Sequence, residues 1–502
     1  MQFGVSESVR HWGKYRPNSP AVYHNHNLYS FRELDEMASI VSNRIEKARI
    51  FDERVGIAVK SKLHLLIAII GILRSGKSPV ILNIGLPLAA LRLNISDTKL
   101  SALISDHEFD AINGLPSFKD GCVLDIDDVI SRADSDDRTY RPSTLRKPEN
   151  EWGVIFSSGT TGPPKGIERD QSSIITELLG WCIELQLIRG TFFYIGRPIY
   201  YTGGLVLSLS TLLVGGAICV TDFEGDDDPK EIWNDYQKVL ISHAVSWAFF
   251  VPDQIRAFVK IIEQEGIQRA GAEKVLVMGA PISGEEKAKA AQFLRSKVVE
   301  SWGNSESLGT ITEPEDLQTR PNSIGRPFIT DELYVLSEDE KVAEPGVTGR
   351  LAGSDVEGFL KYSNRPKETR LVKRSGMIVS DDLGYTDADG YFYILGREQE
   401  CVIRGTRTIF LGDIEKKLRE NQQISDCCVI AKPVNNGVFA LVAVIIPAPG
   451  LLTDTTVWLD ELNKLLPLQM RVDQILVRND LPHLPSGKQD KVQVAQLIDE
   501  VS

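Results

Sequence analysis

A run of glycines and hydroxyl side chains carries the clearest chemistry in this sequence. It reads Ser157-Ser158-Gly159-Thr160-Thr161-Gly162-Pro163-Pro164-Lys165-Gly166. Glycines let backbone N–H groups approach an anion closely, the hydroxyls add hydrogen-bond donors, and Lys165 supplies a mobile cation. The run is not a Walker P-loop, because its lysine follows a proline and precedes a glycine. We therefore expect a phosphate-binding loop of another kind, and the alternative is a flexible surface loop.

Further segments that suit nucleotide chemistry follow along the chain. They are Gly279-Ala280-Pro281, Trp302-Gly303-Asn304-Ser305-Glu306, Ser380-Asp381-Asp382-Leu383-Gly384-Tyr385, Gly396-Arg397 and Pro482 to Lys488. Taken singly, each has an ordinary structural explanation. A tryptophan usually packs in a core, a glutamate lies on the surface, and a lysine in a Pro-Ser-Gly-Lys turn is usually solvated.

In their order and spacing these segments resemble the adenylate-forming superfamily of acyl-CoA synthetases, carrier-loading adenylation domains and luciferases. The resemblance runs from about Ser30 to Lys488, and the loop at 157–166 matches the family pattern at every defined position. Ser305 replaces the usual threonine and keeps its hydroxyl. The resemblance implies an AMP-forming acid–CoA ligase, in which ATP converts a small carboxylic acid to an acyl adenylate, pyrophosphate leaves, and the thiol of CoA takes the acyl group.

The resemblance also implies a role for each matched residue. Lys488, Ser305 and Glu306 would be catalytic, with Lys488 bridging the carboxylate and the α-phosphate and Glu306 binding Mg²⁺. Trp302 would stack on adenine, and Asp382 would accept the ribose hydroxyls beside Arg397. The full set implied in ATP and AMP binding is Ser157, Ser158, Gly159, Thr160, Thr161, Gly162, Lys165, Gly279, Ala280, Pro281, Trp302, Gly303, Asp382 and Arg397.

Two tyrosines stand where the family gates its acid site. Tyr200 and Tyr201 lie in Pro198-Ile199-Tyr200-Tyr201-Thr202-Gly203-Gly204, and no acidic residue follows until Asp222. Relatives that activate amino acids place an aspartate here, so an ordinary α-amino acid is disfavoured. The expected pocket residues are Tyr200, Tyr201, Gly203 and Trp247, although core packing explains Trp247 equally well. An uncharged aromatic pocket favours an aryl or medium aliphatic acid.

The segment that resembles the family hinge departs from its pattern. Glu400 stands in place of the usual aspartate, Ile403 in place of a lysine, and the glycine comes one position early, followed by Thr406. This loop borders the entry path of the thiol in the family. A carrier-protein phosphopantetheine arm therefore remains an alternative acceptor to CoA, and a non-catalytic nucleotide-binding relative is a third possibility.

The elements that must position these residues follow an α/β rhythm. Ser30 and Glu33 form a capping box, and strands at 55–59, 78–82 and 102–104 alternate with helices at 64–73 and 86–95. A second α/β series runs from 152 to 301, and short strands follow from 325.

We expect an α/β fold with an N-terminal adenylation domain at 1–395, made of two α/β lobes plus a small β-barrel unit. A small mobile α+β lid would occupy 396–502, with the active site in the cleft between them.

Composition excludes several other classes of protein. The 502 residues include 56 basic and 69 acidic side chains, a net charge of −13, which argues against nucleic-acid binding. Six cysteines without a CxxC motif exclude a disulfide scaffold and favour the cytoplasm.

The uncharged stretch from Pro198 to Thr221 is interpreted as a buried helix and strand rather than a membrane span. Asp125 to Asn150, rich in Asp, Ser, Pro and Arg, is expected to be a surface connection.

Overall fold

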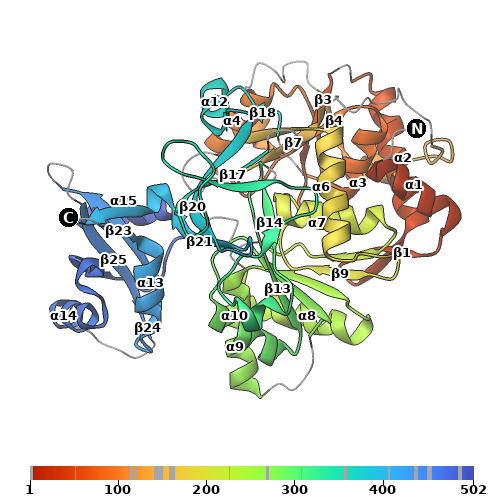
Figure 1. The fold of residues 1–502 in the computed structure, drawn as a ribbon. Helices are drawn as coiled ribbons and strands as arrows, with labels where there is room; N and C mark the ends of the chain where they lie inside the picture. Colours follow the sequence, from red (N-terminus) through yellow and green to blue (C-terminus); the bar gives the residue numbers. More distant parts are fainter. Residues whose placement is uncertain are drawn as a thin grey trace. The chain divides into compact units, whose positions relative to one another are not determined.

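The computed structural model describes residues 4–50, 52–107, 109–113, 118, 122–140, 151–157, 164–224, 227–266, 271–306, 308–354, 359–404, 407–434, 439–448, 455–483 and 489–501. The chain forms two compact units (Figure 1). The larger unit draws on the ranges 1–158, 164–333 and 352–379, and the smaller unit on 334–351 and 380–502.

The larger unit contains a nine-stranded sheet that is parallel in its middle. Strands β1, β10, β9, β11, β12 and β13 run parallel, and β2, β14 and β15 add antiparallel edges. In sheet order the strands are β15 (Arg326–Pro327), β14 (Gly309–Ile311), β13 (Lys297–Gly303), β12 (Lys274–Met278), β11 (Trp247–Phe250), β9 (Phe192–Ile195), β10 (Ala217–Val220), β1 (Pro20–His24) and β2 (Asn27–Ser30).

A second, seven-stranded sheet belongs to the same unit. Its order is β18 (Lys361–Tyr362), β8 (Gly166–Asp170), β7 (Glu151–Phe156), β4 (Ser78–Ile81), β3 (Arg54–Ala58), β5 (Ala102–Ser105) and β6 (Cys122–Asp125). Strands β7 to β6 are parallel, while β8 and β18 are antiparallel additions. The predicted strands at 55–59, 78–82 and 102–104 are therefore present as β3, β4 and β5.

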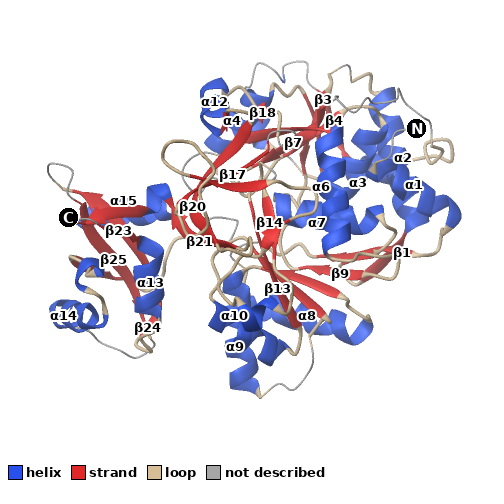
Figure 2. Cartoon of the chain, in the orientation of Figure 1, coloured by secondary structure: helices blue, strands red, loops and turns tan. Residues whose placement is uncertain are grey.

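One hydrophobic core joins the two sheets. It contains residues from both sheets and from the helices between them, α2 (Phe31–Lys47), α3 (Lys62–Arg74), α6 (Gln171–Glu184) and α7 (Thr202–Leu213) (Figures 1 and 2). Every side chain of α3 except His64 is buried, which explains why its sequence is apolar all round. The expected capping box of Ser30 and Glu33 begins α2, and α1 (Val5–Tyr15) packs beside it.

Separate cores cover the outer faces of the two sheets. Helices α8 (Pro229–Ser242), α9 (Pro252–Glu265) and α10 (Gly284–Leu294) cover the nine-stranded sheet. Helix α4 (Leu88–Thr98) covers the seven-stranded one. Parallel sheets with helices on both faces place their loops at the carboxyl ends of the strands, where ligands bind in α/β proteins.

A five-stranded sheet follows the second α/β series. It consists of β16 (Leu333–Leu336), β17 (Gly349–Ser354), β20 (Met377–Thr386) and β19 (Lys373–Arg374), with β21 (Phe392–Arg397) paired to β20. The short helices α11 (Asp316–Thr319) and α12 (Pro366–Val372) belong to the same part of the sequence.

The C-terminal part of the smaller unit is α+β. A hairpin of β22 (Cys401–Arg404) and β23 (Arg407–Phe410) precedes a three-stranded sheet of β24 (Ile424–Pro433), β25 (Phe439–Pro447) and β26 (Gln474–Val477). Helices α13 (Leu411–Arg419) and α14 (Thr455–Leu465) pack on one side of that sheet. Helix α15 (Lys491–Val501) packs on the other side.

Two expectations about local structure have clear outcomes. The uncharged stretch from Pro198 to Thr221 folds as α7 followed by β10. Among the helices of the described residues, none combines the length and apolar composition that crossing a bilayer requires. The expected surface connection from Asp125 is wrong at its start, where Asp125 caps a short helix α5 (Ile126–Ser131) that buries Ile126 and Val129.

Candidate active site

The glycine-rich segment connects two antiparallel strands rather than a strand and a helix. It leaves β7 at Ser157 and enters β8 at Gly166, and these strands pair along their length. Ser157 N donates to Lys165 O at 3.0 Å, and Lys165 N donates to Ser157 Oγ at 3.0 Å. The two ends of the loop are therefore held together. Ser158, Gly159, Thr160, Thr161 and Gly162 lie outside the described residues.

The adenine-binding candidates follow two neighbouring parallel strands, β12 and β13. Gly279 comes directly after β12 with φ of +104°, a backbone conformation that favours glycine, and Ala280 and Pro281 continue the segment. Half-buried Trp302 and exposed Gly303 end β13. Because β12 and β13 pair in parallel, these two segments meet at one edge of the sheet.

The loop after β13 brings Ser305 to the start of α7. Thr202 Oγ1 donates to Ser305 Oγ at 2.9 Å. Thr202 is the first residue of α7, and Tyr201 precedes it as the N-cap. The candidate α-phosphate residue and the candidate acid-gate segment are therefore in direct contact. Thr202 was not singled out by the sequence.

Glu306 and Lys165 both contact a third residue, Tyr362. The hydroxyl of Tyr362 donates to Glu306 Oε1 at 2.5 Å. The ammonium of Lys165 lies 4.8 Å from the centroid of the Tyr362 ring. Tyr362 is buried in the short strand β18, which pairs with β8 directly after Lys165. No local sequence pattern points to these contacts, because Tyr362 is far along the chain from both Lys165 and Glu306.

An ion pair between buried Lys62 and partly exposed Glu224 supports the tyrosines of the expected acid pocket. Tyr200 donates from its hydroxyl to Glu224, and Lys62 Nζ contacts the other carboxylate oxygen of Glu224 at 2.6 Å. The Lys62 side chain is only 1% exposed. Asn83 Nδ2 donates to the Tyr201 hydroxyl at 3.0 Å. Both phenol groups are therefore engaged, and burial raises the pKa of Tyr200 and of Tyr201 well above the usual value.

Gly203 lies where α7 approaches two apolar side chains. A Cβ atom at this position would come within 2.6 Å of Met278 Cε and 3.6 Å of Phe249 Cζ. This contact places two apolar side chains beside the start of α7, in the wall around Tyr201, and the buried guanidinium of Arg197 interacts electrostatically with Tyr200 and Tyr201. Trp247 is not brought to this wall. It begins β11, roughly 10 Å from that strand's carboxyl end at 3.3 Å per residue, and packs against Phe193.

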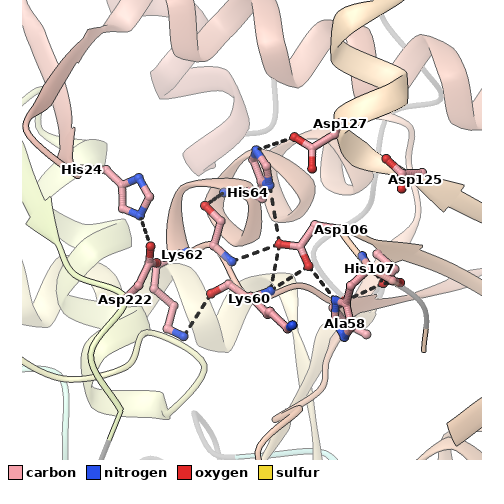
Figure 3. A network of polar contacts seen from close by, with 12 residues as sticks. His24, Ala58, Lys60, Lys62, His64, Asp106, His107, Asp125, Asp127 and Asp222 are labelled. Carbon is pink, nitrogen blue, oxygen red and sulfur yellow. Dashed lines mark hydrogen bonds and ion pairs between the residues drawn. The ribbon is translucent and has the colours of Figure 1, made fainter. Parts of the chain in front are cut away.

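The segment before α3 is held by two carboxylates (Figure 3). Asp222 Oδ1 accepts from Lys62 N at 2.9 Å, and its Oδ2 contacts His24 Nε2 at 2.9 Å. Asp106 accepts from the backbone N–H groups of Lys60 and Ser61. Burial opposes ionisation of Asp222, but its hydrogen bonds outweigh burial and lower its pKa to about 2. These contacts fix Lys62 where it meets Glu224.

The ribose candidates pair within the smaller unit. Asp382 on β20 lies opposite Arg397 on β21, and Arg397 Nε donates to Asp382 Oδ1 at 3.4 Å. Glu400, the expected hinge residue, accepts from Lys491 Nζ at 3.0 Å. Lys488, Gly405 and Thr406 lie outside the described residues, and the side chain of Ile403 is not described.

Comparison with known proteins decides the family. A family model described as AMP-binding enzyme matches residues 9–356. The chain belongs to the AMP-binding enzyme family. Bacitracin synthase 2 of Bacillus licheniformis is 27% identical over 97% of this chain, which spans only 19% of that protein. An uncharacterised acyl–CoA ligase of Bacillus subtilis, YhfT, is 25% identical, with 83% of each chain covered.

A solved structure shows the same fold over nearly the whole length. O-succinylbenzoate CoA synthetase (MenE) from Bacillus subtilis, in complex with its acyl-adenylate intermediate, superimposes with a TM-score of 0.84. It is 17% identical, and 97% of each chain is covered. The predicted α/β architecture of this AMP-binding enzyme is therefore confirmed.

Proposed function

We propose that this AMP-binding enzyme is an acid–CoA ligase that forms AMP. It would convert a small carboxylic acid and ATP to an acyl adenylate and pyrophosphate, and then transfer the acyl group to the thiol of CoA. The observation that carries the proposal is the meeting of Ser305, Glu306 and Lys165 around Thr202 and Tyr362. These are the hydroxyl, carboxylate and ammonium that the reaction needs at the triphosphate.

The residue roles form part of the same proposal. Ser305 would donate to the α-phosphate, Lys165 with the loop at 157–162 would bind the outgoing phosphates, and Lys488 would join the acid carboxylate to the α-phosphate. Adenine would lie between Trp302–Gly303 and the segment Gly279–Pro281, and the ribose would bind Asp382 beside Arg397. Charge accumulates on the phosphate oxygens during transfer, so positioned donors lower the barrier.

The donor set near Glu306 fits a magnesium ion. Mg²⁺ at nucleotide sites takes one or two carboxylates together with substrate phosphates. Glu306 offers one half-buried carboxylate whose Oε1 is already oriented by Tyr362. When bound, Mg²⁺ would neutralise charge on the phosphate oxygens.

The acid is proposed to be uncharged beyond its reacting carboxylate, either aryl or medium aliphatic. The hydroxyls of Tyr200 and Tyr201 are both engaged, and Lys62 is paired with Glu224. The wall therefore offers ring faces, Met278 and Phe249 to a substrate, and the buried guanidinium of Arg197 lies near both tyrosines and Glu224. Such a surface suits an apolar acyl tail.

The division into an adenylation domain at 1–395 and a mobile lid at 396–502 remains a proposal. Glu400 and Lys491, which pair within the smaller unit, both belong to the proposed lid. Limited proteolysis tests the idea: cleavage near Glu400 should change when a non-hydrolysable acyl-adenylate analogue binds. An unchanged cleavage pattern would count against movement of the lid.

The six cysteines of the sequence support the cytoplasm as the proposed compartment.

A carrier-protein phosphopantetheine arm is the second candidate acceptor. The departures from the family pattern at Ile403 and Thr406, in the loop that borders the entry path of the thiol in the family, favour it. To decide, the protein is incubated with ATP, Mg²⁺ and a panel of acids, with and without CoA, and the products are identified by mass spectrometry. Acyl-CoA with AMP supports the ligase, whereas an acyl adenylate without thioester supports the carrier. Lys488→Ala should abolish adenylate formation while ATP still binds.

A further inference from the structure

Contacts within the protein hold Tyr362 in place. Its strand β18 pairs with β8, with Tyr362 opposite Ile167. Its backbone N–H donates to Thr369 Oγ1 at 3.0 Å, and its ring lies 4.8 Å from the ring of Phe359. The residue is 3% exposed. A side chain held on several sides has little freedom to move. The positions of its hydroxyl and its ring, which contact Glu306 and Lys165, are therefore well defined.

The two charged residues that the side chain of Tyr362 contacts, Lys165 and Glu306, come from different sheets. Lys165 precedes β8 of the seven-stranded sheet, and Glu306 follows β13 of the nine-stranded sheet. The phenol hydroxyl contacts Glu306, while the ring face contacts the ammonium of Lys165. One side chain therefore contacts two charged groups that the chain brings together from separate sheets.

The two contacts of the Tyr362 side chain differ in kind and in strength. A hydroxyl that donates to Glu306 Oε1 orients the carboxylate and leaves its other lone pairs available. An ammonium over a ring face is held more weakly than one paired with a carboxylate. Lys165 over the ring is therefore more easily drawn to a phosphate than a lysine paired with a carboxylate would be.

We propose that Tyr362 is a positioning residue with two separable effects. Its hydroxyl orients Glu306 for a divalent cation, and its ring holds Lys165 ready for the outgoing phosphates. This inference rests on the proposed function. It goes further because it assigns metal affinity and phosphate affinity to two different parts of one side chain.

Two substitutions separate the effects. Tyr362→Phe removes the hydroxyl and keeps the ring, and Tyr362→Leu removes both. Tyr194→Phe is the matched control, because Tyr194 is also buried and donates to a carboxylate, Asp235 Oδ2 at 2.9 Å, away from the candidate site. Binding of α,β-methylene-ATP is measured by calorimetry without metal. Binding of Mn²⁺ to the complex with this analogue is then measured by electron paramagnetic resonance.

We expect Tyr362→Phe to weaken Mn²⁺ binding about tenfold, as loss of a hydrogen bond to a charged group does, with metal-free analogue affinity unchanged. Tyr362→Leu should also weaken metal-free analogue binding about fivefold. Tyr194→Phe should change neither affinity. Unchanged Mn²⁺ binding in Tyr362→Phe, or an equal loss in Tyr194→Phe, overturns the proposal. A wild-type protein that binds no analogue overturns the proposed function together with it.

Discussion

The hydroxyl of Thr202 donates to the hydroxyl of Ser305 across a distance of 2.9 Å. Because Ser305 accepts this bond, its own hydrogen stays available for a phosphate oxygen. The contact joins the first residue of α7 to the loop after β13, so it links the acid-gate segment to the proposed α-phosphate site. The proposed acid and α-phosphate sites are therefore joined by one hydrogen bond.

Substitution of Thr202 tests this coupling. Thr202→Val keeps the shape and removes the donor, and we expect adenylation measured by ATP–pyrophosphate exchange to fall about tenfold in kcat/KM. Thr202→Ser keeps the hydroxyl and should retain most activity. Equal loss in both variants would show that the methyl group matters and the hydrogen bond does not.

Lys62 should control acid binding through Glu224. Lys62→Met removes the ammonium that holds Glu224, so the support of Tyr200 weakens. We expect the KM for the acid to rise about tenfold while the KM for ATP stays unchanged, because misplacement at a binding wall is costly. Steady-state kinetics with varied acid and varied ATP separates the two constants.

The control for Lys62 is Lys230→Met. Lys230 also pairs with a glutamate, Glu265, at the surface of the larger unit, where ion pairs contribute little. This variant should change neither constant. An ATP KM that rises with the acid KM in Lys62→Met would indicate a general loss of structure.

Lys287 and Glu300 should dominate the stability of β13. Their side chains are 5% and 8% exposed, and Lys287 Nζ lies 2.6 Å from Glu300 Oε2. Lys287→Met leaves a buried carboxylate without its partner, which should lower the free energy of unfolding by about 3–5 kcal/mol. The double variant Lys287→Met/Glu300→Leu should recover most of that loss, as measured by urea unfolding.

The effect of Lys287→Met should also depend on pH. Burial raises the pKa of Glu300 even with Lys287 present. Without the lysine the carboxyl should protonate at still higher pH, and the neutral form is easier to bury. The deficit in unfolding free energy should therefore shrink as the pH falls. A deficit independent of pH would mean that lost packing, rather than charge, causes it.

Asp222 should contribute stability that is lost in acid. Its hydrogen bonds with His24 and the backbone of Lys62 lower its pKa to about 2 against a burial effect of opposite sign (Figure 3). A lowered folded-state pKa gives stability that is present above the ordinary pKa and lost as the pH falls through about 2. Asp222→Asn should therefore show a shallower fall in unfolding free energy between about pH 4 and pH 2 than the wild type. Parallel curves for the two proteins would contradict this assignment.

Much of the fold was predictable because its signals are local. The strands expected at 55–59, 78–82 and 102–104 are present as β3, β4 and β5, and the capping box at Ser30 starts α2 as predicted. Helix α5 was missed because the charged residues after Asp125 obscured the small apolar stripe of Ile126 and Val129. For Trp247 the sequence left pocket and core as equal alternatives, and its place at the start of β11, packed against Phe193, agrees with the core.

The proposed reactive groups of the candidate site were predictable from the sequence, whereas the side chains that contact them were not. Ser305, Glu306 and Lys165 stand in recognisable local patterns. Thr202, Tyr362 and Lys62 act through partners distant in sequence, as with Lys62 and Glu224, which are 162 positions apart. One sequence records no such pairing, because contacts of this range depend on the packing of whole layers.

The core shared by the two sheets of the larger unit has a consequence for folding. Helices α3, α6 and α7 contribute to one core that contains residues of both sheets, so the facing sides of the two sheets share a single interior. The two lobes should therefore melt in a single cooperative transition, with equal calorimetric and van't Hoff enthalpies for that unit. They are not interchangeable modules: a fragment that kept one lobe would expose the apolar side chains that the other covers, and it would aggregate rather than fold.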